Sequence, residues 1–241
     1  MHTRGDDGDS RTALYRHSCP LRHTTEVVRA HVGLPQVVVL PARPDLQFET
    51  QGAAAAIRAA LPKAIVEVPD VPLDLASYES VRAFGEHMRT GGSTIDVLCL
   101  NAARGGSESD KAEVTADDHE ATMQVNLLSH ALLVHELLPN LRRSSNARIV
   151  VHSSGTRTNA QQSSLDDLVG KRRSTNPFSQ YILSKAGLCL FARAVRHALL
   201  ALTWPSTCVP PGTHTPAHTT RNDTLAGTTL PLLPRSLLLL P

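Results

Sequence analysis

The sequence lacks the features by which several classes of protein are recognised. Its four cysteines are scattered, without the spacing of a zinc site or a CxxC redox motif. Lysine plus arginine exceed aspartate plus glutamate by only 24 to 22, which does not favour a nucleic-acid or polyanion partner. No apolar run is long enough to span a bilayer, and the N-terminus does not resemble a signal peptide. We therefore expect a cytoplasmic protein without a membrane or nucleic-acid partner.

A metal-binding pattern is also missing. His17, Cys19 and His23 are close in sequence, but their spacing matches no zinc site. His214 and His218 flank a proline, which bars the helix that would bring them to one face. We interpret the twelve histidines as composition and predict no bound metal.

The length and composition suit one globular domain. The chain has 241 residues, of which 41% are hydrophobic and 19% charged. Residues 1–26 are polar and charged, and we expect them to be disordered and outside the domain. Residues 27–202 carry the pattern of the folded domain, and 203–241 read as a tail rich in Thr and Pro.

Short apolar runs alternate with helix-prone segments along the domain. The runs are apolar throughout, which is typical of parallel strands that are buried on both faces. This pattern predicts an α/β fold, a Rossmann-like three-layer domain with a mostly parallel sheet covered by helices. The predicted strands are 37–40, 64–68, 95–100 and 148–152, and the predicted helices are 51–61, one that begins after Ser77, 118–141 and 177–202.

Polar residues follow two of these strands, where an open parallel sheet binds its ligands. Asn101 follows strand 95–100, and Ser153-Ser154 follow strand 148–152. The next helix opens with Tyr181 and Lys185, which are four apart and therefore share one face. We expect these side chains to form one site.

The Tyr181–Lys185 pair suits proton transfer. A free phenol ionises near pH ~10 and is a poor acid–base catalyst at neutral pH, but a nearby lysine cation favours the phenolate. The pair would then move a proton at a carbonyl or alcohol oxygen. The apolar stripe expected on the opposite side of this helix consists of Leu183, Gly187, Leu190 and Ala194.

Taken together, these motifs resemble the short-chain dehydrogenases/reductases. A strand followed by Ser153-Ser154, and then Tyr181-x-x-Ser184-Lys185, resembles the catalytic region of that family. The resemblance covers about residues 27–217. Further matching elements, in the family's order, are Leu73-Asp74-Leu75, Leu100-Asn101-Ala102-Ala103, Met123-Gln124-Val125-Asn126 and Pro211-Gly212-Thr213-His214-Thr215.

The resemblance implies an oxidoreductase that interconverts an alcohol and a ketone or aldehyde by hydride transfer. It implies that Tyr181 is the general acid or base, and that Lys185 tunes it and binds the nicotinamide ribose. Ser154 would bind the substrate oxygen, and Asn126 would position a water linked to Lys185. The substrate would be a small molecule, and family members form homo-oligomers through helices like 118–141 and 177–202.

The resemblance also implies the cofactor, NADP with NAD as the alternative. Arg43 follows strand 37–40, where members that prefer NADP carry a basic residue for the 2′-phosphate, and an arginine fork suits a phosphate. A plain surface arginine is the equal alternative. The other residues implied to bind the cofactor are Asp74, Asn101, Tyr181, Lys185, Pro211, Gly212, Thr213 and Thr215.

The sequence departs from the family at both ends. The family begins with a strand and Thr-Gly-x-x-x-Gly-x-Gly, whose glycines let the backbone approach the pyrophosphate. The chain has no such motif, and by analogy a central strand is lost with it. The Asn101 element ends in Ala103 where the family has Gly, and no last strand or closing helix is recognisable after Gly212.

Two other functions are therefore considered. The second hypothesis is a non-catalytic remnant of the family, from a truncated or wrongly delimited gene, that does not bind cofactor. A hydrolase is a poor third, because the sequence around Ser153 and Ser154 lacks the Gly-x-Ser-x-Gly elbow. For the leading hypothesis, the 26 residues between Ser154 and Tyr181 resemble the retinol-dehydrogenase-like and fungal biosynthetic branches. That length favours a lipophilic or secondary-metabolite substrate.

Overall fold

The fold is built on one sheet of six parallel strands. The computed structural model describes residues 37–105, 113–160, 176–200, 206–209 and 236–239. The strand order is β2-β1-β6-β3-β4-β5, and every neighbouring pair is parallel. The strands are β1 (Val37–Val39), β2 (Ile65–Glu67), β3 (Val97–Leu100), β4 (Arg148–His152), β5 (Ser206–Val209) and β6 (Ser236–Leu239).

The helices connect these strands in the alternating order that the sequence predicts. Parallel strands need crossover connections, and helices supply those from β1 to β2, from β2 to β3, from β3 to β4 and from β4 to β5. Among the residues that the structure describes, no helix is long and apolar enough to cross a membrane. The helices and helical turns are η1 (Pro44–Leu46), α2 (Gln47–Ala60), α3 (Tyr78–Thr90), α4 (Ala121–Met123), η2 (Gln124–Leu128), α5 (Ser129–Arg142), η3 (Gly155–Asn159) and α7 (Pro177–Leu200).

Local sequence explains where several helices begin. Ser77 caps α3, because its side chain accepts a hydrogen bond from the Ser80 N–H. Glu120 caps α4 in the same way by accepting from Met123 N at 2.7 Å. An alanine run, 53–56, gives α2 a high helix propensity, and Pro62 follows its end. These signals set where α3 and α4 begin and where α2 ends.

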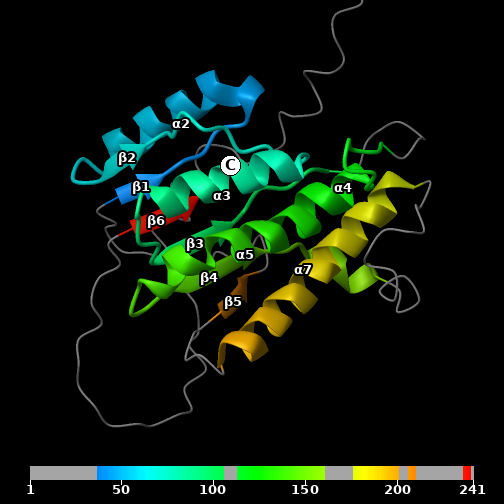
Figure 1. The fold of residues 1–241 in the computed structure, drawn as a ribbon. Helices are drawn as coiled ribbons and strands as arrows, with labels where there is room; N and C mark the ends of the chain where they lie inside the picture. Colours follow the sequence, from blue (N-terminus) through cyan, green and yellow to red (C-terminus); the bar gives the residue numbers. More distant parts are fainter. Residues whose placement is uncertain (1–36, 106–112, 161–175, 201–205, 210–235, 240–241) are drawn as a thin grey trace, which may run out of the picture.

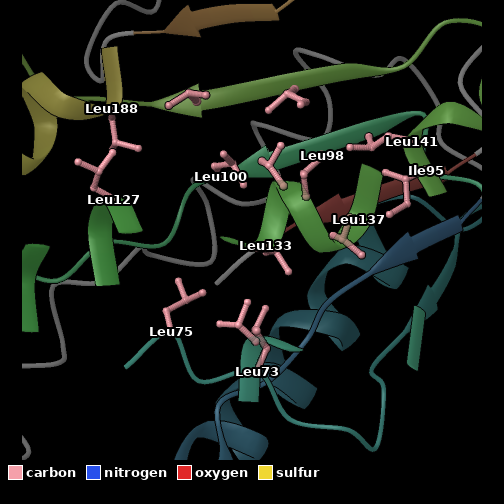
Figure 2. Close-up of a cluster of buried hydrophobic side chains, with 14 of the residues drawn as sticks. Leu73, Leu75, Ile95, Leu98, Leu100, Leu127, Leu133, Leu137, Leu141 and Leu188 are labelled. Carbon is pink, nitrogen blue, oxygen red and sulfur yellow. The ribbon is translucent and has the colours of Figure 1, made fainter. Parts of the chain in front are cut away.

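The side chains of β3 show how the sheet is covered on both faces. Leu98 and Leu100 belong to the cluster under α3, α5 and α7, whereas Val97 and Cys99 belong to the cluster under α2. All four are fully buried. Figure 1 shows α3 and α5 side by side along the sheet, with α7 beside β5. Figure 2 shows the larger cluster, in which leucines of α5 and β3 lie together. The α/β Rossmann-like fold is therefore confirmed.

The centre of the sheet is formed by the last strand in the chain. β6 lies between β1 and β3 and pairs with both, so that Leu238 is opposite Val39 on one side and Leu98 on the other. The chain runs outward from this position in two directions, through β1 to β2 and through β3 to β5. β6 thus stands where the strand order reverses, and this is where ligands bind in open α/β sheets. It fills the place of the central strand whose loss the family analogy implied.

Several details differ from the sequence prediction. Strands β5 and β6 lie within 203–241, where the sequence analysis found no strand. Helix α2 begins at Gln47, four residues before the predicted start, and the predicted helix 118–141 contains the π-helical turn η2. The predicted disordered segment 1–26 lies outside the described residues.

Candidate active site

The predicted site residues follow the carboxyl ends of the strands. Arg43 lies after β1, Asn101 directly follows β3, and Ser153 and Ser154 directly follow β4. Because all strands are parallel, these ends lie along one edge of the sheet. Asp74 is reached from β2 through a loop whose Leu73 N–H donates to the Ala42 carbonyl, next to Arg43. The strand ends therefore share one side of the domain.

The most distinctive charge at this edge is a buried ammonium. Lys185 of α7 is only 3% exposed, and its Nζ donates to the His152 carbonyl at 3.1 Å, at the end of β4. The same Nζ lies 5.8 Å from the ring centroid of half-buried Tyr181. The Tyr181 ring also stacks on Phe178, with centroids 6.4 Å apart. The structure thus brings the phenol and the ammonium together beside the residues that precede Ser154.

The apolar stripe predicted on α7 is half correct, because Leu183 and Gly187 are buried. Leu190 is 44% exposed and Ala194 is exposed as well, so that part of the stripe faces solvent. The buried face continues from Lys185 to Leu188 and Ala192, at spacings of three and four. The helix is turned this way because the Lys185 ammonium reaches the end of β4, which brings the face of the polar pair toward the sheet.

The two serines after β4 have different contacts. Ser153 Oγ donates to the Lys185 carbonyl at 2.7 Å and accepts from Cys189 Sγ at 3.2 Å, so it joins β4 to α7. Ser154 Oγ accepts from the N–H of Thr156 at 3.3 Å and from its hydroxyl at 3.0 Å. Ser154 thereby caps η3 and retains its own hydroxyl proton for a further acceptor.

Asn126 joins the loop after β3 to α7. Its Oδ1 accepts from the Arg104 N–H at 2.6 Å, and its Nδ2 donates to the Arg104 carbonyl at 2.9 Å and to Ser184 Oγ at 3.0 Å. Ser184 Oγ in turn donates to the Tyr181 carbonyl at 2.8 Å. The Asn126 side chain is fully buried. It therefore fixes the turn of α7 that runs from Tyr181 to Ser184.

Asn126 also lies in an irregular turn. Residues 124–128 form the π-helical turn η2, in which the Ser129 N–H bonds to the Gln124 carbonyl five residues earlier. The Asn126 carbonyl is bonded by a side chain, since His130 Nδ1 lies 2.9 Å from it. Such π turns are frequent at functional sites. Sequence reasoning missed this turn, and also the parts played by Arg104 and His130; the only sequence signal was a histidine one turn after Asn126.

Some of the residues predicted to bind a cofactor already make contacts within the protein. Arg43 makes a bidentate contact with Asp45, at 2.6 Å through Nε and 2.5 Å through the second nitrogen, and these hydrogen bonds lower the pKa of the Asp45 carboxyl. Asp74 Oδ1 accepts from the Ala76 N–H at 2.8 Å. The remaining predicted contacts, Pro211, Gly212, Thr213 and Thr215, lie outside the described residues, as do the histidines and cysteine weighed as metal ligands.

Comparison with known proteins identifies the family. The family described as short chain dehydrogenase matches residues 47–165. These residues include β2, β3, β4 and Asn126, and they end after the Ser153-Ser154 pair. The chain belongs to the short-chain dehydrogenase/reductase family. The resemblance read from the motifs is thereby confirmed, and the family is one of oxidoreductases.

Curated members of the dehydrogenase/reductase family match parts of the chain. The short chain dehydrogenase/reductase mfmJ of Annulohypoxylon moriforme is 39% identical over 95 residues, which are 39% of this chain and 26% of that protein. The polyprenol dehydrogenase of Mus musculus is 37% identical over 141 residues, which are 57% of this chain and 41% of that protein. The chain thus spans less than half the length of these curated relatives.

Solved structures of other proteins show the same fold. A crystal structure from Mycobacterium paratuberculosis is 26% identical, with a TM-score of 0.54 over 76% of this chain and 71% of that one. A metagenomic short-chain oxidoreductase in complex with NADP has a TM-score of 0.57 over 78% and 75%, at 21% identity. The arrangement of helices around a parallel sheet is therefore that of a dehydrogenase/reductase.

Proposed function

We propose that this protein is an NADP(H)-dependent oxidoreductase that interconverts an alcohol and a ketone or aldehyde, with Tyr181 as the acid/base. The observation that carries the proposal is the buried Lys185 ammonium, held between the end of β4 and the Tyr181 ring. Burying a charge almost completely costs free energy unless polar or charged partners compensate it. Such an arrangement is typical of a functional site.

The chain's own residues would handle the proton. In the reducing direction, the Tyr181 hydroxyl gives its proton to the substrate oxygen, and the Lys185 cation stabilises the phenolate that is left. The free hydroxyl proton of Ser154 would donate to the same substrate oxygen and hold it near Tyr181. Asn126 would keep Tyr181 in place through Ser184. When bound, the dinucleotide supplies the hydride.

The residues at the sheet edge fit a nicotinamide nucleotide in part. Lys185 and Tyr181 would hold the nicotinamide ribose, Asp74 lies in the loop after β2, and Asn101 directly follows β3. Arg43 would bind the 2′-phosphate of NADP once its fork leaves Asp45. NADP is also the ligand named for the metagenomic oxidoreductase of the same fold.

A small lipophilic molecule is the proposed substrate class. The support comes from the 26 residues between Ser154 and Tyr181, a span that includes residues outside the described ones. It also comes from the name of one relative, the polyprenol dehydrogenase of Mus musculus.

Replacement of the Tyr181 hydroxyl tests the proposal. We expect Tyr181→Phe to lower carbonyl reduction by at least ~100-fold, because general acid catalysis by one side chain contributes that much. The assay is the loss of NADPH absorbance with a panel of lipophilic ketones and aldehydes, and circular dichroism checks the fold. Tyr78→Phe is the matched control, since Tyr78 lies on α3 against His119. Unchanged turnover in Tyr181→Phe would remove this residue from the mechanism.

A non-catalytic remnant of the family is the second candidate. It is favoured by the missing glycine motif and by the engagement of Arg43 with Asp45, both of which weaken the hold on a dinucleotide. Titration of the purified protein with NADPH, followed by nucleotide fluorescence, separates the two candidates. Saturable binding supports the enzyme, and no binding up to millimolar NADPH supports the remnant.

A further inference from the structure

One buried histidine next to Asn126 has a ring nitrogen without a hydrogen-bond partner in the described part of the chain. His130 lies on α5, one turn after Asn126, and its side chain is fully buried. Its Nδ1 is 2.9 Å from the Asn126 carbonyl. Its Nε2 is buried as well, and it has no hydrogen-bond partner within the described part of the chain.

The contact of Nδ1 determines the tautomer of the ring. A carbonyl oxygen can only accept, so Nδ1 must carry the proton that it shares with the Asn126 carbonyl. Burial, opposed in part by that hydrogen bond and helped by the nearby Lys185 cation, lowers the pKa of His130 from 6.5 to about 4. The imidazole is therefore neutral near pH ~7, and Nε2 is a bare acceptor.

A bare acceptor in the interior calls for a partner. Buried polar atoms of proteins are nearly always hydrogen-bonded, either to the chain or to an internal water. The effect of the Lys185 charge on His130 shows that the ring lies within electrostatic range of the ammonium that serves Tyr181. Through Nδ1 the ring is joined to Asn126, whose side chain donates to Ser184 Oγ on α7.

We propose that His130 is a positioning residue of this site, which holds the Asn126 carbonyl through Nδ1 and binds an internal water through Nε2. The proposal rests on the proposed oxidoreductase function and adds a member to its machinery. The water donates one hydrogen to Nε2 and keeps its oxygen and second hydrogen for other polar groups. His130 acts through these partners and does not touch the substrate.

Nuclear magnetic resonance of the protein without cofactor tests the water site directly. In a long-range ¹H–¹⁵N spectrum of uniformly ¹⁵N-labelled protein, the signals lost in His130→Asn identify the His130 ring. We expect the Nδ1–H tautomer, with the Nε2 resonance displaced from the position of a free imine nitrogen toward that of a hydrogen-bonded one. A free imine position, or a proton on Nε2, would overturn the proposal.

Kinetics test the positioning role. His130→Asn keeps an N–H where Nδ1 was and removes Nε2, whereas His130→Phe removes both groups at similar volume. Each lost hydrogen bond should lower kcat by about tenfold with little change in KM, so Phe should lose more than Asn. His135→Asn is the control, because His135 lies on the same helix with its side chain 77% exposed.

The two tests separate the inference from the proposed function. If both His130 variants keep the kcat of the original protein, His130 is not a positioning residue. If the original protein shows no turnover with any substrate, the proposed function fails, and the spectrum still decides whether Nε2 binds a water. If His130→Phe does not fold, His130→Asn and the spectrum of the original protein carry the test.

Discussion

At the residue scale, the cofactor preference depends on a surface ion pair. Arg43 is the proposed contact for the 2′-phosphate of NADP, and Asp45 occupies its fork. Because an exposed ion pair of this kind is worth about 0.2–1 kcal/mol, we expect Asp45→Asn to tighten NADPH binding by up to about fivefold. NADH has no 2′-phosphate, so its affinity should stay the same. Fluorescence titration with both nucleotides measures the ratio, and an equal change for both would contradict the role of Arg43.

His130 makes the stability of the domain depend on pH. Its folded-state pKa of about 4 lies below the ordinary value of 6.5. Between these two pH values the unfolded chain binds a proton at His130, whereas the folded protein does not. Stability therefore falls as the pH is lowered through the window, by at most ~1.4 kcal/mol per pH unit from this group. The free energy of unfolding, measured in urea at several pH values, should depend less steeply on pH in His130→Gln. His135→Gln, at an exposed site, should keep the pH dependence of the original protein.

The sequence allowed some site residues to be predicted and not others, for a physical reason. Tyr181 and Lys185 were found because a helix brings residues four apart to one face, and the contact at 5.8 Å agrees with that rule. The links from Asn126 to Arg104 and Ser184 cross 22 and 58 residues of sequence, and no local pattern encodes such distances. His130 could not be assigned a role until its burial was known.

At the scale of elements, α3 and α5 approach closely through a glycine. A Cβ added to Gly85 of α3 would lie 2.6 Å from Cβ of Glu136 on α5. We expect Gly85→Ala to destabilise the domain by ~1–3 kcal/mol, because overpacking outweighs the gain in helix propensity. The measurement is the free energy of unfolding in urea.

A second glycine provides the control for that substitution. Gly52 is exposed on α2, and nothing lies within 4 Å of an added Cβ. Gly52→Ala should therefore stabilise the protein by ~0.5–1 kcal/mol. Equal effects of the two substitutions would show that α3 and α5 do not pack as described.

The elements also show the limits of pattern reading. β4 was predicted with its observed bounds, Arg148–His152, because a continuous apolar run marks a strand buried on both faces. β5 was missed because its four residues carry too little periodicity, and β6 because its leucines are not β-branched and prolines flank them. The π turn at Gln124–Leu128 was missed because it keeps the apolar spacing of an ordinary helix over a few residues.

At the scale of the whole molecule, chain order and sheet order diverge at one position. β6 comes last in sequence, yet it stands between β1 and β3, where the order of the strands reverses. The parallel register of β6 on both neighbours joins two half-sheets, β2-β1 and β3-β4-β5, into one. The continuous edge on which Arg43, Asn101 and Ser154 lie therefore depends on a segment far from them in sequence.

A proline in β6 tests this dependence. Leu238 has neighbours on both sides, and proline lacks the N–H that a central strand donates to its ladder. We expect Leu238→Pro to lower the free energy of unfolding by at least ~1–3 kcal/mol, the cost of leaving a buried partner unbonded. Leu238→Val keeps the backbone N–H and a high strand propensity, and should unfold close to the original midpoint in urea. If the proline and valine variants unfold alike, residues 236–239 do not form the central strand, and the two half-sheets are joined by another part of the chain.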